Sequence, residues 1–326
     1  MDSTTKDNED RAQAAQIFTH TSEQDGTQMM HVSDESAVTT LESIWSASQD
    51  ADDVAFRPRN GWWSLHDWAT ASWLLVKDGT PVGVAAIRYT PDDDKAEARL
   101  ALLPAFRQTS LALLLVKQVR SVAQTQHKAR LILATSATAD WVKSTIQQQN
   151  FSLLRTGHMM SRPISATPLP FSEIEGIHVR SLRTGEEPQL LETLNRAWAN
   201  TWNFHPITME ALLDDLKDNY DSFFVAVDQT DDTRMLGTVH VLFDRSSDES
   251  DPWISNLTVD PSQRGKGLGR MLLTVALNYL SKQGASSVTL GVDGGAVAPV
   301  TLYRSIGFEA IRTLEVWEQD IATPQQ

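Results

Sequence analysis

The segment with the clearest potential for chemistry combines three glycines with three cations and reads Arg264-Gly265-Lys266-Gly267-Leu268-Gly269-Arg270. It lies between an apolar, strand-like run over 253–259 and an amphipathic run that begins at Met271. A turn with alternating glycines at the start of a helix exposes backbone N–H groups that have no partner inside the helix, and no Cβ blocks an approaching anion. The sequence therefore predicts a pyrophosphate-binding site at this turn.

Other phosphate-binding motifs fit these glycines less well. The spacing Gly265-x-Gly267-x-Gly269 differs from the G-x-G-x-x-G of a dinucleotide fold, and no Gly-Lys-Ser/Thr follows, as a P-loop requires. A glycine-rich turn between a strand and a helix, without any ligand, is the plain structural alternative. The surrounding elements must decide between a ligand site and a simple turn.

The elements that would hold this turn follow from the hydrophobic periodicity of the second half of the chain. We expect strands over 177–182, 222–228, 235–243, 253–259, 287–292 and 308–318. Helices are expected over 185–199, 208–217, 267–283 and 297–306. Two helices, three consecutive strands and then helix-strand-helix-strand is a mixed α/β order, for which one sheet with helices on both faces is the natural solution.

The first half of the chain repeats the landmarks of the second half. Pro104 matches Pro261 at an offset of 157 residues (261 − 104), and the same offset relates Arg107 to Arg264 and Phe151 to Phe308. A proline-rich stretch separates the halves. The sequence therefore predicts a polar tail over 1–28, a degenerate N-terminal domain over 29–162, a linker over 163–176 and a C-terminal domain over 177–320.

Composition excludes several classes of function. The 326 residues carry 28 Lys and Arg against 42 Asp and Glu, a net charge of −14, which argues against a nucleic-acid partner. The absence of cysteine removes disulfides and thiolate chemistry and fits the cytoplasm. No apolar run is long enough for a membrane span. A monomer and a homodimer both remain open.

Two signatures together resemble the GNAT superfamily of acyl-CoA-dependent N-acetyltransferases, in a tandem form. The first runs from Leu257 through the glycine turn to Leu273, and the second reads Leu302-Tyr303-Arg304-Ser305-Ile306-Gly307-Phe308. The resemblance implies an α/β fold of two tandem GNAT-like domains, each a mixed, mostly antiparallel sheet with helices on both faces. It also implies acetyl-CoA as co-substrate and no metal.

The same resemblance assigns contacts to acetyl-CoA. The pyrophosphate would bind the turn from Arg264 to Arg270, where the helix dipole and the side chains of Arg264, Lys266 and Arg270 favour negative charge. The pantetheine arm would hydrogen-bond along the preceding strand, through the backbone of Leu257, Thr258 and Val259. These three residues would serve equally as core strand residues, and both roles are compatible.

Catalytic roles are implied less completely. Tyr303 stands where many family members carry a tyrosine that protonates the departing thiolate, although a half-buried helix tyrosine that packs against the last strand is the plain alternative. The usual strand carboxylate that would serve as base is missing. Asp251, at the start of that strand, is our first candidate, with His240, Asp293 and a water-relayed path as alternatives.

The acceptor is expected near the loop between the first two helices of the second half, where aromatic and polar side chains cluster: Trp198, Trp202, Asn203, Phe204 and His205. The spacing of Trp198 and Trp202 equally suits one buried helical stripe. In the first half, Ser110, Ala112 and Ile146 replace Gly267, Gly269 and Tyr303. We therefore expect the N-terminal domain to be catalytically inactive.

The expected function is transfer of an acetyl group from acetyl-CoA to a primary amine of a small molecule, in the C-terminal domain. Among tandem members of the family, the chain is similar to the mycothiol synthases, which acetylate the cysteinyl amine of a small glycoconjugate. Trp253, Gly291 and Ala296 depart from their pattern. A non-catalytic sensor that binds acyl-CoA is the alternative from another class.

Overall fold

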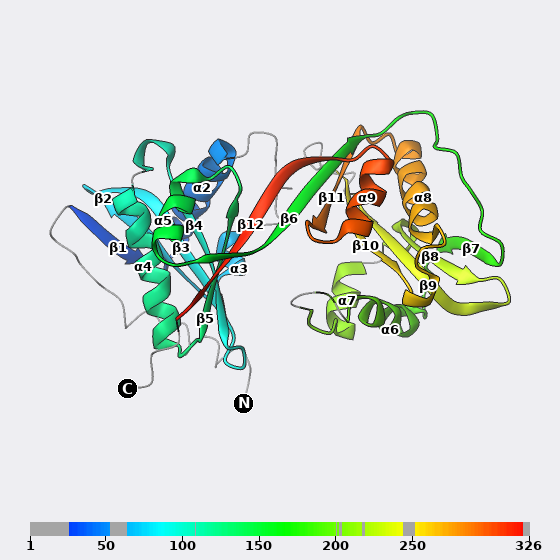
Figure 1. The fold of residues 1–326 in the computed structure, drawn as a ribbon, viewed down its shortest axis with the longest axis horizontal. Coiled ribbons are helices and arrows are strands. Elements are labelled where there is room, and N and C mark those ends of the chain that lie inside the picture. Colours follow the sequence, from blue (N-terminus) through cyan, green and yellow to red (C-terminus); the bar gives the residue numbers. More distant parts are fainter. Residues whose placement is uncertain are drawn as a thin grey trace. The chain divides into compact units, whose positions relative to one another are not determined.

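The computed structural model describes residues 26–52, 64–107, 109–199, 201, 204–216, 219–243 and 252–321. They form two compact units (Figure 1). Unit 1 combines Met1–His158 with Ile311–Gln326, and unit 2 comprises Met159–Ala310. The expected α/β class with two units is confirmed. The tail expected over 1–28 falls almost entirely outside the described residues.

Unit 1 is a sheet covered by helices on both faces. Its strands are β1 (Thr27–His31), β2 (Ala71–Lys77), β3 (Thr80–Tyr89), β4 (Lys95–Leu102), β5 (Arg130–Ser136), β12 (Glu309–Asp320) and the start of β6 (Ser152–Pro163), in the order β1-β2-β3-β4-β5-β12-β6. The β4–β5 pair is parallel, and the β1–β2, β2–β3, β3–β4 and β5–β12 pairs are antiparallel. Its helices are α2 (Glu35–Asp52), α3 (Leu65–Trp68), α4 (Thr109–Thr125) and α5 (Asp140–Gln148).

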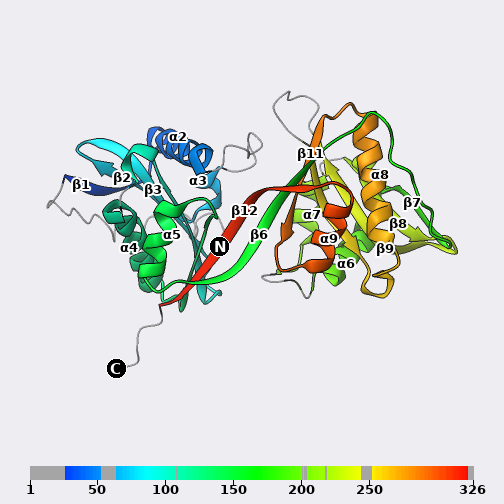
Figure 2. The ribbon, with the colours of Figure 1, turned by 45° about the horizontal axis from the view of Figure 1, so that its top comes forward.

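Two hydrophobic cores fix these helices to the sheet of unit 1. Alternate residues of β2 point to opposite faces, so that Trp73 and Leu75 pack under α4 and α5 while Leu74 and Val76 pack under α2 and α3. Figure 2 shows the two helix pairs on opposite sides of the strands. The sheet is therefore a buried central layer.

Unit 2 repeats this plan. Its strands are the end of β6, β7 (Ile177–Ser181), β8 (Phe223–Asp228), β9 (Asp231–Leu242), β10 (Trp253–Val259) and β11 (Ser287–Asp293), in the order β6-β11-β10-β9-β8-β7. The β10–β11 pair is parallel, and the β7–β8, β8–β9 and β9–β10 pairs are antiparallel. Helices α8 (Leu268–Lys282) and α9 (Val297–Ser305) cover one face, and α6 (Glu187–Trp198) and α7 (Met209–Leu216) the other (Figure 1).

Each strand and helix expected in the second half is present, most within two residues of its expected bounds. The largest difference is at the start of β9, which begins at Asp231 rather than at 235. Asp228 pairs directly with Asp231, so the hairpin is tighter than the polar sequence Asp228–Thr233 indicates. The turn residues themselves extend the strands.

The final strand differs from the expected organisation. Residues 311–320 were expected in the C-terminal domain, but they belong to unit 1, because β12 pairs with β5 from Leu314↔Ser136 to Asp320↔Arg130. Trp317 of β12 is buried in the core of unit 1. The other domain limits stay a prediction.

The expected linker, 163–176, begins with the last residue of β6, Pro163, contains no further helix or strand, and is held against α8. The backbone N–H of Leu169 donates to Asn278 Oδ1 at 2.7 Å, and Asn278 Nδ2 donates back to Leu169 O at 3.1 Å. Ser281 Oγ donates to Ser165 O at 2.8 Å. Three apolar residues of the segment pack on the core of unit 2: Ile164, Leu169 and Ile174. No helix of the described residues is long and apolar enough to cross a bilayer.

Candidate active site

The glycine turn of unit 2 joins β10 to α8 through a short 3-10 turn, Pro261–Gln263. Gly265 and Gly267 have φ angles of 77° and 89°, in the left-handed region where glycine carries no steric penalty. A Cβ built at Gly265 would meet no atom within 4 Å. Gly267 is the N-cap of α8 and offers no side chain to cap the helix. The first N–H groups of α8 therefore begin at an open, uncapped turn.

Gly269 has a different role. A Cβ at this position would lie 3.2 Å from Leu302 Cδ2 on α9 and 3.7 Å from Val259 Cγ2 on β10. Its missing side chain therefore lets α8 approach α9 and β10 closely, while Leu268 beside it is buried. This glycine therefore supports the packing beneath the turn, and its expected contact with an anion stays a prediction.

The three cations of the turn are exposed and bond to neutral groups. Arg264 donates from Nε to Val259 O at 3.3 Å and from Nη2 to Ala197 O at 3.2 Å. Lys266 Nζ donates to a glutamine oxygen at 3.0 Å, and Arg270 Nη2 to Ser305 Oγ at 2.6 Å. Within the described part of the chain, none of the three has an ion pair with a carboxylate. The turn is thus electropositive within an acidic protein.

Strand β10 leaves its parallel neighbour just before this turn. It pairs with β11 only at Trp253↔Thr289 and Ile254↔Leu290, so the described residues of β11 leave 255–259 of β10 without a partner on that side. Leu257, Thr258 and Val259 lie in this splayed stretch. An extended ligand can hydrogen-bond to an unpaired strand edge in the manner of an added strand.

The other edge of β10 is irregular at the same place. Its register with β9 shifts between Ser255 and Thr258, and Asn256 has a left-handed φ of 49°. The buried hydroxyl of Thr238 fixes this bulge, since it donates to Asn256 O and bonds Thr258 Oγ1, both at 2.8 Å. Bulges commonly redirect side chains beside functional sites.

Tyr303 lies on α9 and is 7% exposed. Its ring packs in the core of unit 2, with its centroid 5.8 Å from that of Phe308. Burial raises the pKa of Tyr303 to about 12, so the hydroxyl keeps its proton at neutral pH. The ring therefore has the packing expected for a core tyrosine, and its role as a proton donor stays a prediction.

The candidate bases occupy different surroundings. Asp251 lies outside the described residues. Asp293 is exposed at the end of β11, where its Oδ1 accepts a hydrogen bond from the Gly295 N–H at 3.0 Å. His240 is fully buried on β9, opposite Ser255, and its ring is stacked on Phe223 with centroids 4.6 Å apart.

Around His240 the structure reveals a carboxylate that sequence reasoning missed. Asp215 on α7 has its Oδ2 atom 3.8 Å from His240 Nδ1, and the same oxygen accepts from Asn256 Nδ2 at 3.4 Å. Burial lowers the pKa of His240 to about 4 and outweighs the attraction of this carboxylate. A polar residue on an exposed helix face gives no sequence signal that separates it from an ordinary solvated carboxylate.

The expected aromatic cluster is only partly described. Trp198 packs at the edge of the core under α6, as expected for a helical stripe. Phe204 is half-buried and His205 is exposed. Trp202 and Asn203 lie outside the described residues. Asn195 fixes the loop beyond, since its side chain accepts from Ile207 N at 2.8 Å and donates to Ile207 O at 3.1 Å.

The corresponding turn of unit 1 is closed by an acidic side chain. Arg107 donates to Leu102 O and Ser48 O, as Arg264 does to Val259 O and Ala197 O. In addition, Arg107 Nη1 lies 2.9 Å from Oδ1 of Asp52, whose side chain is 4% exposed. Burial raises the pKa of Asp52, and Arg107 opposes this rise. The arginine of this turn is already neutralised.

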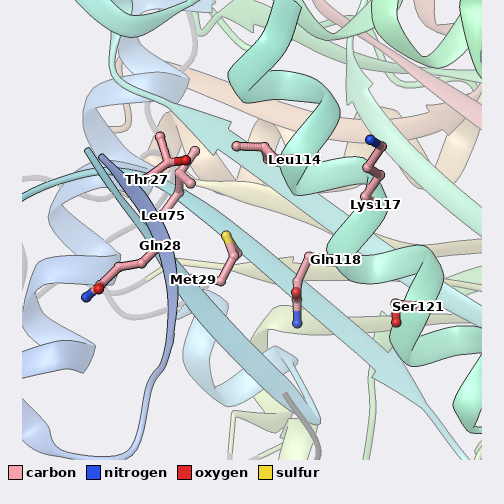
Figure 3. A pocket seen from close by; sticks show the side chains of 8 residues that line it. All are labelled: Thr27, Gln28, Met29, Leu75, Leu114, Lys117, Gln118 and Ser121. Carbon is pink, nitrogen blue, oxygen red and sulfur yellow. The ribbon is translucent and has the colours of Figure 1, made fainter. Parts of the chain in front are cut away.

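A hollow of about 190 Å³ in unit 1 lies apart from this turn (Figure 3). It is lined from β1, β2 and α4 by Thr27, Gln28, Met29, Leu75, Leu114, Lys117, Gln118 and Ser121. None of the residues predicted for a site in either half is among them. The described residues also contain no cluster of three or more His, Asp or Glu side chains suited to a metal.

Comparison with known families finds a match in each half of the chain. The family described as "Acetyltransferase (GNAT) family" matches residues 37–143 and 188–308. The mycothiol acetyltransferase of Thermobispora bispora is 30% identical over 252 residues, which cover 73% of this chain and 80% of that protein. The resemblance carried by the glycine turn and the Tyr303 segment is confirmed at the level of the family.

Solved structures show the same fold. A GCN5-related N-acetyltransferase from Sphaerobacter thermophilus aligns with a TM-score of 0.73 at 21% identity and covers 93% of this chain and 98% of its own. A tandem GNAT protein from the clavulanic acid biosynthesis pathway aligns with a TM-score of 0.66 at 12% identity, over 92% of this chain and 100% of its own. At these identities the likeness concerns the fold, and it agrees with a tandem arrangement.

Proposed function

Since this chain belongs to the GNAT family and is an acyl-CoA-dependent acetyltransferase, we propose that unit 2 moves an acetyl group from acetyl-CoA to a primary amine of a small molecule. The observation that carries the proposal is the open turn at Gly265 and Gly267, with its uncapped helix and with cations that have no carboxylate partner among the described residues. The splayed edge of β10 lies directly before it.

In this proposal acetyl-CoA occupies the turn and the strand edge together. The pyrophosphate accepts from the N–H groups of Gly265 to Gly269, and Arg264, Lys266 and Arg270 supply positive charge. The bonds of Arg264 to backbone oxygens, at 3.2 and 3.3 Å, are neutral contacts that a phosphate oxygen can replace with a stronger charged one. The pantetheine arm follows Leu257, Thr258 and Val259.

The transfer itself is a direct attack. The amine nitrogen bonds to the thioester carbonyl carbon, the C–S bond breaks, and the sulfur leaves with the electron pair. Tyr303 remains protonated because burial raises its pKa to about 12, so its hydroxyl can donate a hydrogen bond to the developing thiolate. The amine must also lose a proton, which requires an acceptor on the opposite side of β10.

The relatives named mycothiol acetyltransferases favour a narrower acceptor, the amine that such enzymes acetylate. Trp253 and Gly291 differ from the mycothiol synthase pattern, and they lie together here. A Cβ at Gly291 would be 3.4 Å from Cζ2 of the Trp253 ring, so the indole lies over this glycine. The ring changes the surface next to the bulge, where the acceptor would approach. Other small amines therefore stay candidates.

The test combines binding and turnover in one sample. Acetyl-CoA at 100-fold over its Kd would stabilise the unit that binds it by about 2.7 kcal/mol, a rise in Tm of about 5–10 °C. Thiol release on addition of primary amines would then report transfer. We expect a Tyr303→Phe variant to keep the thermal shift and to lose turnover by about 10²-fold. A thermal shift without thiol release for any amine would favour the sensor, and no thermal shift would contradict the acetyl-CoA site.

A further inference from the structure

We propose that Asp215 on α7 is the carboxylate that receives the proton of the acceptor amine, with the buried His240 of β9 positioning it. The proposal rests on the proposed function of unit 2, because it names the proton acceptor for that same transfer. It assigns to a helix the group that the strand before the glycine turn lacks.

Two side chains of the sheet approach the Asp215 carboxylate at the irregular part of β10. Asn256 donates from Nδ2 to Asp215 Oδ2 at 3.4 Å, and His240 Nδ1 lies 3.8 Å from the same oxygen. His240 faces Ser255 across the β9–β10 pair, just before the register shifts. The carboxylate thus lies over residues 255 and 256, on the face of the sheet that α6 and α7 cover.

This is the place at which the reacting end of acetyl-CoA would arrive. With the pyrophosphate at Gly265 and Gly267, the pantetheine arm would extend back along Val259 and Leu257, toward the start of β10. The thioester is the far end of that arm, so it would reach the bulge at Asn256. Asn256 is the residue that contacts Asp215. The carboxylate and the thioester would then meet at one bulge.

The exposure of the two side chains separates their roles. The side chain of Asp215 is 45% exposed, so an acceptor can approach it from solvent and a captured proton can leave. His240 is fully buried, with its ring stacked on that of its cross-strand neighbour Phe223 on β8, and cannot touch the acceptor. Because burial keeps its imidazole neutral, His240 presents a polar ring to Asp215 without cancelling the carboxylate charge. It acts as a positioning residue.

The proton step balances without a further reactant. The acceptor arrives as an ammonium ion, R–NH3⁺, and one N–H bond breaks as the carboxylate of Asp215 takes the proton. The free amine then attacks the thioester carbonyl, and the proton that the nitrogen sheds on amide formation offsets the one taken up by the thiolate. Asp215 returns its proton to water. The acceptor class is therefore a cationic primary amine, which a carboxylate attracts before it deprotonates.

The test uses the full chain and primary amines as probes: glucosamine, S-methylcysteine amide and spermidine. Thiol release would be measured for the unaltered protein, Asp215→Asn and Asp215→Glu, with Glu210→Gln as a control of equal charge change on the exposed face of the same helix. We expect Asp215→Asn to lower kcat by 10²-fold or more, Asp215→Glu to recover part of it, and Glu210→Gln to stay within twofold. The thermal shift with acetyl-CoA should be unchanged in all four.

The outcomes distinguish a failure of the Asp215 proposal from a failure of the proposed acetyltransferase function. If the unaltered protein acetylates a probe and Asp215→Asn acetylates it equally fast, Asp215 is not the proton acceptor, and the proposed acetyltransferase function stands. Absence of turnover with every probe, together with absence of a thermal shift, would overturn both. For His240, a His240→Gln variant should lower kcat while the KM for acetyl-CoA stays constant. An equal change in both parameters, or none, would remove it from a positioning role.

Discussion

The turn at Arg107 in unit 1 and the turn at Arg264 in unit 2 share a backbone plan and differ in what faces the arginine. Both arginines donate to the last carbonyl of the preceding strand and to a carbonyl near the end of the first long helix. Arg107 also has a buried partner, Asp52, whereas Arg264 has no carboxylate partner among the described residues. The arginine of one turn has an internal counter-charge, and the arginine of the other is the one for which we propose a phosphate partner.

The difference lies in one internal ion pair, while the backbone plan of the turn is the same in both units. In unit 1 the carboxylate of Asp52 stands where a phosphate would neutralise the arginine, and Trp141 holds it through an Nε1 hydrogen bond at 3.3 Å. The same indole lies under the Arg107 guanidinium, 5.6 Å from its ring centroid. Arg107, Asp52 and Trp141 together form part of the packing of unit 1.

The largest effect is expected where the internal partner is removed. Asp52→Asn should destabilise unit 1 by about 3 kcal/mol, because it leaves the partly buried Arg107 without a counter-charge. Urea unfolding, followed by hydrogen exchange in unit 1, measures the change. Asp94→Asn breaks a solvent-exposed pair with Arg130 and should leave the unfolding midpoint unchanged. An equal loss of stability in Asp52→Asn and Asp94→Asn would contradict the claim that Asp52 is the required counter-charge of Arg107.

A nearly equal effect is expected from acid in unit 2. Gly83 of β3 pairs with the last residue of β4, Leu102, as Gly237 of β9 pairs with the last residue of β10, Val259. His240, three residues after Gly237, therefore occupies the position that Ala86 fills in unit 1, and both are fully buried. The pKa of His240 falls from 6.5 in the unfolded chain to about 4 in the folded protein. The unfolded state therefore binds the proton first, and stability that is present above pH 6.5 is lost as the pH falls toward 4, by about 3 kcal/mol.

Hydrogen exchange of unit 2 amides between pH 7 and pH 4 measures this loss. A His240→Ala variant, which copies unit 1, should be less stable at pH 7 through the cavity it leaves, but its stability should change less over the same interval. If the stability of unit 2 in His240→Ala falls with pH as steeply as in the unaltered protein, another group causes the acid sensitivity.

A smaller effect is expected from copying the unit 1 turn into unit 2. Gly267→Ser combined with Gly269→Ala should weaken acetyl-CoA binding by at least tenfold, about 1.4 kcal/mol. Serine is strained at a φ of 89°, and the alanine methyl would press on Leu302. Calorimetric titration measures the change. The reverse exchange in unit 1, Ser110→Gly with Ala112→Gly, should create no binding because Arg107 stays paired with Asp52.

The smallest effect is expected from a single cation. Lys266→Ala should weaken acetyl-CoA binding by up to about 1 kcal/mol, roughly fivefold, and less at high salt, because its side chain is exposed. Lys282→Ala, at the opposite end of α8, is the matched control and should have no effect. A loss as large as that of the glycine exchange would mean that side-chain charge, rather than the backbone turn, dominates anion binding.

The sequence predicted the α/β class, two units and the elements around the glycine turn because these depend on local patterns. Strand β10 has the expected bounds, 253–259, since apolar residues end abruptly at Asp260 and Pro261. The sequence could not predict that β12 belongs to unit 1. Its pairing with β5 places Leu314 opposite Ser136, and no local pattern specifies so distant a partner.

The site was predictable where function depends on the backbone and less so where it depends on packing. Alternating glycines predict a turn with positive φ. They do not show that Gly269 lacks a side chain because Leu302 packs closely against it. The loss of glycine in the first half was visible, whereas the Asp52–Arg107 pair joins residues 55 positions apart (107 − 52) and required the fold. Asp215 was hidden for the same reason, since only the fold brings α7 to the bulge of β10.

Hydrogen exchange with and without acetyl-CoA tests the contrast between the two turns most directly. The structure predicts slower exchange on binding in the peptides that contain Leu257–Val259 and Arg264–Arg270, and unchanged exchange around Arg107. Protection confined to the Arg107 turn, or equal in both turns, would contradict the claim that unit 2 alone carries the acetyl-CoA site.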